Sequence, residues 1–157
     1  IMANRLGGLF AVAGKITDID TVQRNVLGTR ATDELGNEYI YLAGIAATAV
    51  NVAIVYQATT YVAKILTADD VGQVAIAQAA VLAANWGWFQ IYGFYTTCKS
   101  DTVAAAGALF IDDTPGRVDD SSVAGDEIFG MVSTGSDATN LLPVHLQYPY
   151  VGNTVPA

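Results

Sequence analysis

The residues that could carry out chemistry in this chain are few and scattered. The single histidine, His145, would need a nucleophile and an orienting partner to act as a general base. The chain contains no Gly-x-Ser-x-Gly, His-Glu-x-x-His or phosphate-binding glycine motif. The single cysteine, Cys98, precedes Lys99, a neighbour that can activate a thiol. We expect His145 on the polar side of a strand and Cys98 half-buried near a strand end, so the sequence predicts a protein that is not an enzyme.

Acidic residues form a more regular pattern. Three pairs, at 112–113, 119–120 and 126–127, are spaced seven residues apart. Calcium binds about six to eight oxygen ligands, so carboxylates in a glycine- and serine-rich loop could hold it, although the spacing is not that of an EF-hand. Paired carboxylates also serve glycosidases, but nothing singles out two of the fifteen acids. We expect these side chains to lie in turns and face water, and we predict neither a metal site nor a cofactor.

Aromatic residues form a second pattern. If residues 86–93 are a strand, Trp86, Trp88 and Tyr92 share one face with Gln90. Such a stripe could stack on sugars or bases, or it could anchor a subunit interface, where Trp and Tyr are enriched. It could also be a buried core face. The sequence leaves these three interpretations open.

Length and composition exclude several classes of protein. The chain has 157 residues, of which 52% are hydrophobic and only 14% are charged, enough for one domain with its own core. The few charges exclude disorder of the whole chain, and the net charge of −8 argues against a nucleic-acid partner. One cysteine excludes an intrachain disulfide. Residues 71–98 are uncharged, but their glycines, glutamines and mid-segment tryptophans argue against a membrane span.

Charge divides the chain into two parts. Residues 1–32 contain four bases and two acids, whereas residues 33–157 contain three bases and thirteen acids. Glycines interrupt the first part, which has no sustained apolar period. We therefore expect residues 1–32 to be an extended arm that docks on a partner, or else a loose terminus.

Short strands separated by turns dominate the second part. Residues 33–37 have turn composition, and the strand-like segments are 38–42, 50–57, 61–66, 86–93, 108–112, 128–133 and 143–148. Alanine content favours a helix over residues 71–84, but Val74 and Ile76 alternate with alanines, and we expect a strand. The sequence predicts an all-β fold: a single compact antiparallel β-barrel or sandwich over 33–157, preceded by the arm.

Several segments together resemble one protein family. They are Leu-Gly-Thr-Arg-Ala-Thr-Asp at 27–33, Gly-Asn-Glu-Tyr-Ile-Tyr-Leu at 36–42 with Gly44, residues 72–77, 87–93 and 124–130, and Leu-Gln-Tyr-Pro-Tyr at 146–150. In these segments the chain resembles the head-decoration (cement) proteins of tailed bacteriophages. The resemblance covers about residues 27–151, and its motifs are structural rather than catalytic.

The resemblance implies a structural virion protein. Such a protein, made in the host cytoplasm, binds the outer surface of an icosahedral phage head and stabilises the capsid as a homotrimer at local three-fold positions. Its partners would be the major capsid protein and other copies of itself, with no nucleic acid and no membrane. The alternative is a stand-alone β-sandwich module that binds carbohydrate through the Trp86 and Trp88 face.

The capsid hypothesis assigns roles to individual residues. The basic residues of the arm would face acids of the shell or of a neighbouring copy, while apolar residues would supply the remaining contacts. The residues expected at a capsid or subunit interface are Arg5, Leu9, Phe10, Lys15, Arg24, Arg30, Trp86 and Trp88. Deleting residues 1–26 would then leave a folded body that binds shells more weakly.

Overall fold

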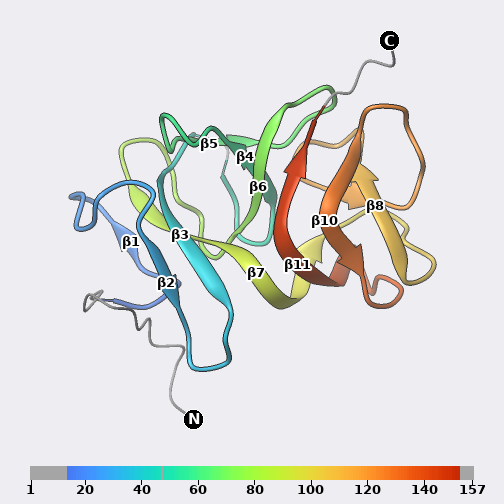
Figure 1. Ribbon diagram of the computed structural model, residues 1–157, viewed down its shortest axis with the longest axis horizontal. Helices are drawn as coiled ribbons and strands as arrows, with labels where there is room; N and C mark the ends of the chain where they lie inside the picture. The colour runs from blue at the N-terminus through green and yellow to red at the C-terminus, as the bar shows by residue number, and fades with distance from the viewer. Residues whose placement is uncertain (1–13, 47, 153–157) are drawn as a thin grey trace.

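The computed structural model describes residues 14–46 and 48–152, and in these ranges all regular elements are β-strands. They form one 11-stranded sheet whose named strands pair in antiparallel fashion, so the expected all-β antiparallel fold is confirmed (Figure 1). The sheet folds into a sandwich-like body rather than a closed barrel. The strands are β1 (Ile19–Asp20), β2 (Arg30–Thr32), β3 (Glu38–Ala43), β4 (Ala53–Tyr56), β5 (Ala63–Ile65), β6 (Gly72–Ala77), β7 (Trp86–Lys99), β8 (Gly107–Ile111), β9 (Val118–Asp119), β10 (Glu127–Ser133) and β11 (Leu141–Val151).

Two long strands connect the ends of this sheet. Figure 1 shows β1, β2 and β3 at one end of the molecule and β8 and β10 at the other, with β7 running between them. The first half of β7 pairs with β3 and β6, and its second half pairs with β11. The last residues of β11 pair in turn with β6 and β10. A strand that changes partners must bend, and shifts of register lie near these places, in the pairing of β7 with β3 and in the pairing of β11 with β10.

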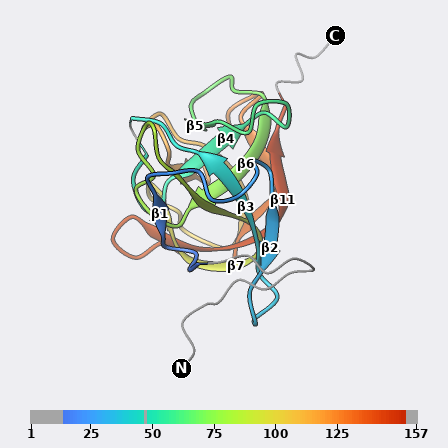
Figure 2. The same cartoon turned by 90° about the vertical axis from the view of Figure 1, so that its left-hand side faces the viewer.

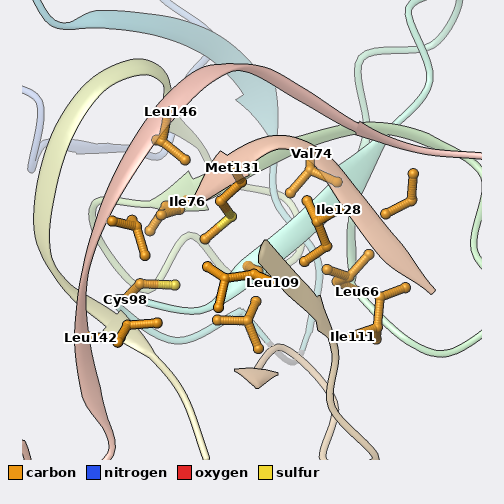
Figure 3. Packing of buried hydrophobic residues seen from close by; sticks show 14 of the residues in the cluster. Leu66, Val74, Ile76, Cys98, Leu109, Ile111, Ile128, Met131, Leu142 and Leu146 are labelled. Atoms are coloured by element: carbon orange, nitrogen blue, oxygen red, sulfur yellow. The ribbon is translucent and has the colours of Figure 1, made fainter. Parts of the chain in front are cut away.

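Buried apolar side chains form three clusters. The first lies at the end of the molecule that carries β8 to β11 and contains Leu109, Met131 and Leu146 (Figure 3). The second lies between β3, β4, β6 and β7 and includes Ile54 and Phe89. The alanines of β6 lie in the second cluster, and Val74 and Ile76 on the opposite face of the strand lie in the first. This division agrees with the alternation of small and large residues in 72–77. The strand expected over residues 71–84 is therefore confirmed only for 72–77, as β6, and residues 78–84 form no strand.

The third cluster corrects the expected arm boundary. Tyr39, Tyr41 and Trp88 form its floor, and Ile16 and Ala31 cover them. Strand β1 pairs with β7, and β2 pairs with β3, so residues 14–32 belong to the folded body (Figure 2, which views the end carrying β1, β2 and β3). The interpretation of residues 14–32 as part of an arm was wrong because Ile16 and Ala31 are buried in this cluster and Leu27 packs against it. The other apolar residues of the segment are exposed, so the sequence shows no sustained apolar period. Residues 1–13 lie outside the described residues.

In the described ranges, no helix is long and apolar enough to cross a membrane.

Candidate docking surface

The expected tryptophan anchors are placed differently from one another. Trp88 is 2% exposed, and its ring lies 5.1 Å from that of Tyr41 in the third cluster. Trp86 is half-buried beside it. Of the three interpretations of this stripe, the core face is the one that the structure bears out for Trp88. Its assignment as a surface anchor was wrong because residues 14–31 cover the side of the sheet toward which it points.

The basic residues also have unexpected partners. The side chain of Arg24 pairs with Asp20 at 3.3 Å, and Arg30 pairs with Glu38 at 3.3 Å. Both arginines therefore have acidic partners within their own chain, although each side chain stays more than half exposed and each pair contributes little stability. Lys15 is exposed and forms no ion pair with the described residues. Arg5, Leu9 and Phe10 lie outside the described residues.

Large apolar side chains are exposed on a different surface. The outer side of β7, β10 and β11, opposite the first cluster, carries a row in which His145 pairs with Phe94 on one side and with Val132 on the other. Phe94 and Val132 are 49% and 44% exposed. We name this surface the aromatic face and define it by Tyr92, Phe94, Phe129, Val132, His145, Tyr148 and Tyr150.

Ring stacking orders this aromatic face. Tyr148 stacks on Tyr92 with 5.2 Å between ring centroids, and Phe129 stacks on Tyr150 at 5.3 Å. Each stacked pair joins side chains from two strands, and such pairs stabilise a sheet modestly. Aromatic side chains that are held in place lose little conformational entropy when a partner covers them.

Tyr148 is the most constrained member of the aromatic face. Its φ angle is +50°, a left-handed conformation that costs free energy in a non-glycine residue. The hydroxyl donates a hydrogen bond of 2.7 Å to Glu38, and the guanidinium of Arg30 lies 5.5 Å from the ring centroid. The hydrogen bond to Glu38 raises the pKa of the Tyr148 phenol, because the carboxylate favours the protonated form. Backbone strain kept at an exposed aromatic residue favours a binding role over a purely structural one.

His145 lies on the outer side of β11, as the alternation predicts, but its surroundings are aromatic. The ring is half-buried and meets the Tyr92 ring edge-on, with 6.3 Å between centroids. Sequence reasoning missed the aromatic face because residues 145 and 147 of β11 are both polar. The apolar neighbours come from β7 and β10, and their position beside His145 depends on strand pairing over long sequence distances.

The acidic pairs do not converge. Asp112, Asp120 and Asp126 accept hydrogen bonds from the backbone N–H groups of Thr114, Ala104 and Asp69, at 2.8, 2.9 and 3.1 Å. The described residues hold no group of three or more His, Cys, Asp or Glu side chains that could bind a metal ion. Asp112 and Asp126 are buried, so the expectation that these acids all face water was wrong for these two, which satisfy backbone donors instead. Burial raises the pKa of Asp119.

Cys98 is more deeply buried than expected. It has no exposed surface, it belongs to the first cluster, and burial raises the pKa of its thiol to about 12. A buried thiol that stays protonated is a poor nucleophile.

Comparison with known proteins identifies no family for this chain. No family model matches the chain, and no curated protein or solved structure matches it.

Proposed function

We propose that the chain is a structural protein that decorates the head of a tailed bacteriophage. In this role it binds the outer surface of the capsid as a homotrimer and stabilises the shell, and the aromatic face makes the principal contact. The resemblance of residues 27–151 to cement proteins supports this function. The chemistry of the described surface supports a binding role rather than catalysis.

The observation that carries the proposal is the exposed aromatic row across β7, β11 and β10. Soluble monomers rarely leave a contiguous group of large apolar side chains in water, and such a group marks a contact surface. Tyr148 and Tyr150 are 44% and 47% exposed, and their hydroxyl groups suit an interface that is apolar in its centre and polar at its rim. With 14% charged residues, the chain also has few side chains to keep such a surface solvated.

The proposal can be tested with Val132→Lys, which puts a charge on the aromatic face next to His145. Val62→Lys is the matched control, because Val62 is 43% exposed against 44% for Val132 and is not part of the aromatic face. Each purified variant is mixed with expanded phage heads that lack the protein, and bound protein is measured after sedimentation. We expect Val132→Lys to reduce binding at least about tenfold, since burying an unpaired charge is costly. Val62→Lys should bind like the unchanged protein.

Two further measurements complete the test. Far-ultraviolet circular dichroism shows whether both variants keep the fold, so that a loss of binding can be assigned to the surface. Light scattering gives the oligomeric state, for which we expect a trimer. Failure of the unchanged protein to bind heads would overturn the proposed function. Equal binding by both lysine variants would show that the contact lies elsewhere.

A further inference from the structure

We propose that the chain carries a binding site for a neutral sugar, which shares Phe94 with the aromatic face but is independent of the proposed capsid function. The site is an open pocket of about 340 Å³, near the lower end of the range of about 300–1,000 Å³ for small-molecule sites. Its wall includes the apolar side chains of Leu35, Phe94 and Tyr95. Gln78 and Gln90 also line it, although their side chains are among the few buried polar ones.

Each glutamine that lines the pocket has a side-chain oxygen that accepts no hydrogen bond from the described residues. Gln90 is 1% exposed, and its amide nitrogen donates to the carbonyl oxygens of Tyr92 and Phe94 at 3.1 and 3.2 Å. Both of its N–H groups are therefore engaged, which fixes the amide and leaves its oxygen as an acceptor. Gln78 is 6% exposed and donates one bond of 3.0 Å to Ile76. Neither side-chain oxygen accepts a hydrogen bond from the described residues, so each can accept one from a ligand.

The charge around the pocket selects an uncharged ligand. Among residues 14–46 and 48–152, no charged side chain lines it. Behind the wall, the Asp33 carboxylate is 7% exposed and accepts hydrogen bonds from Asn37 and from the hydroxyl of Tyr39, each 2.9 Å long. This buried negative charge disfavours an anion, and a cation would find the carboxylate oxygens already occupied.

A sugar satisfies these features better than an apolar ligand would. Sugar hydroxyl groups donate as well as accept, so they can pair with the free oxygens of Gln78 and Gln90. The C–H side of a sugar ring can pack on the Phe94 and Tyr95 rings at the wall. An apolar ligand would leave both amide oxygens unpaired, which lowers affinity. This pocket is not the carbohydrate site that the sequence offered on the Trp86 and Trp88 face, because Trp88 is buried.

Nuclear magnetic resonance titration of the full chain tests this site. The probes are glucose, galactose, mannose and N-acetylglucosamine, with glucuronate as the charged counterpart of glucose. We expect at least one neutral sugar to shift the side-chain amide signals of Gln78 and Gln90, with a dissociation constant of about 1–10 mM. Glucuronate should bind at least about tenfold more weakly than glucose, because its carboxylate finds no cation in the pocket.

Two variants place the ligand in the pocket. Thr96→Arg puts a long side chain into the wall at an exposed position and should abolish the shifts. Thr59→Arg changes another exposed threonine, one that does not line the pocket, and should leave them intact. The absence of shifts with all four neutral sugars, stronger binding of glucuronate, or retained binding in Thr96→Arg would each overturn the proposal. Val132 does not line the pocket, so Val132→Lys separates the two proposals: it should lose head binding and keep the sugar-induced shifts.

Discussion

The hydroxyl of Tyr41 donates a 2.6 Å hydrogen bond to the carboxylate of Asp20, and this bond ties residues 14–32 to the sheet. Tyr41 has no exposed surface and Asp20 is 7% exposed. The backbone N–H of Arg24 donates to the same hydroxyl at 3.3 Å, and the Arg24 side chain pairs with the other carboxylate oxygen of Asp20. The carboxylate thus has two side-chain partners, one buried and one at the surface.

Replacing Tyr41 with phenylalanine should destabilise the fold by about 1–3 kcal/mol, because Asp20 would stay buried with one partner fewer. Urea unfolding followed by circular dichroism measures the change. Tyr148→Phe is the control, since it removes an exposed hydroxyl that also donates to a carboxylate. It should cost less than about 1 kcal/mol. Equal effects of the two substitutions would show that the Tyr41 bond contributes no more than a surface contact.

Stability should fall in alkaline solution. Burial, reinforced by the hydrogen bond to Asp20, raises the pKa of Tyr41 to about 12, and burial also raises the pKa of Tyr39, whose hydroxyl donates to Asp33. Tyrosines of the unfolded chain lose their protons near pH 10, about two units earlier than Tyr41 in the fold. The unfolded state is therefore favoured as the pH rises through about 10 to 12, by up to about 1.4 kcal/mol per pH unit for each such tyrosine.

Two measurements check this pH dependence. The urea midpoint, recorded at steps between about pH 8 and pH 11, should be constant at first and then decline. Ultraviolet absorbance of tyrosinate should show at least two fewer groups titrating near pH 10 in the folded protein than in urea. Tyr41→Phe should decline less steeply than the unchanged protein. A midpoint that stays constant over the whole range would contradict the raised pKa values.

Gly93 should tolerate no side chain. Its φ angle is +98°, and a Cβ atom there would lie 2.0 Å from the Asn37 side-chain oxygen, which accepts a hydrogen bond from the Phe94 N–H. Gly36 is the matched control, with a φ of +83° and no atom within 4 Å of the added Cβ. We expect Gly36→Ala to cost about 1 kcal/mol from backbone strain, and Gly93→Ala to cost about 3 kcal/mol or more. Thermal unfolding of the two variants gives the comparison; similar costs would mean that Asn37 moves aside freely.

Deleting residues 1–26 should damage the fold, contrary to the expectation from sequence. The deletion removes Ile16, which covers Trp88, and Asp20, which binds Tyr41. We expect a red shift of tryptophan fluorescence and a loss of about 3 kcal/mol or more in the free energy of unfolding. A deletion variant with unchanged fluorescence and an unchanged urea midpoint would restore the interpretation of this segment as a docking arm.

Sequence alone predicted the elements whose pattern is local. Alternating side chains predicted β3, β6, β10 and most of β11, because the two faces of each strand have different surroundings. The faces of β3 and β6 enter two different clusters, whereas β10 and β11 have one face in the first cluster and the other largely exposed. Strands β1, β2 and β9 have only two or three residues each, too few to show a period. They exist because neighbouring strands offer unpaired edges, and no pattern in the short segments themselves reveals that.

The candidate surfaces were harder to predict because each is assembled from distant segments. Phe94, Val132 and His145 become neighbours only when β7, β10 and β11 pair. The glutamines of the pocket lie twelve positions apart, Gln78 just after β6 and Gln90 in β7, and neither looks distinctive in the sequence. Trp86 and Trp88 were expected at an interface because of their residue type. The exposure of a side chain depends instead on which segments cover the sheet.

Strand β7 contributes to all three hydrophobic clusters, with Trp88 in the third, Phe89 and Ile91 in the second and Cys98 in the first. One unbroken backbone thus holds both ends of the molecule, and neither end can open without pulling β7 away from the other. The amide hydrogens of β7 should consequently exchange with solvent only through global unfolding. A mechanical load applied at the aromatic face would likewise travel along this strand to the cover formed by residues 14–31, so the chain resists tension as one unit.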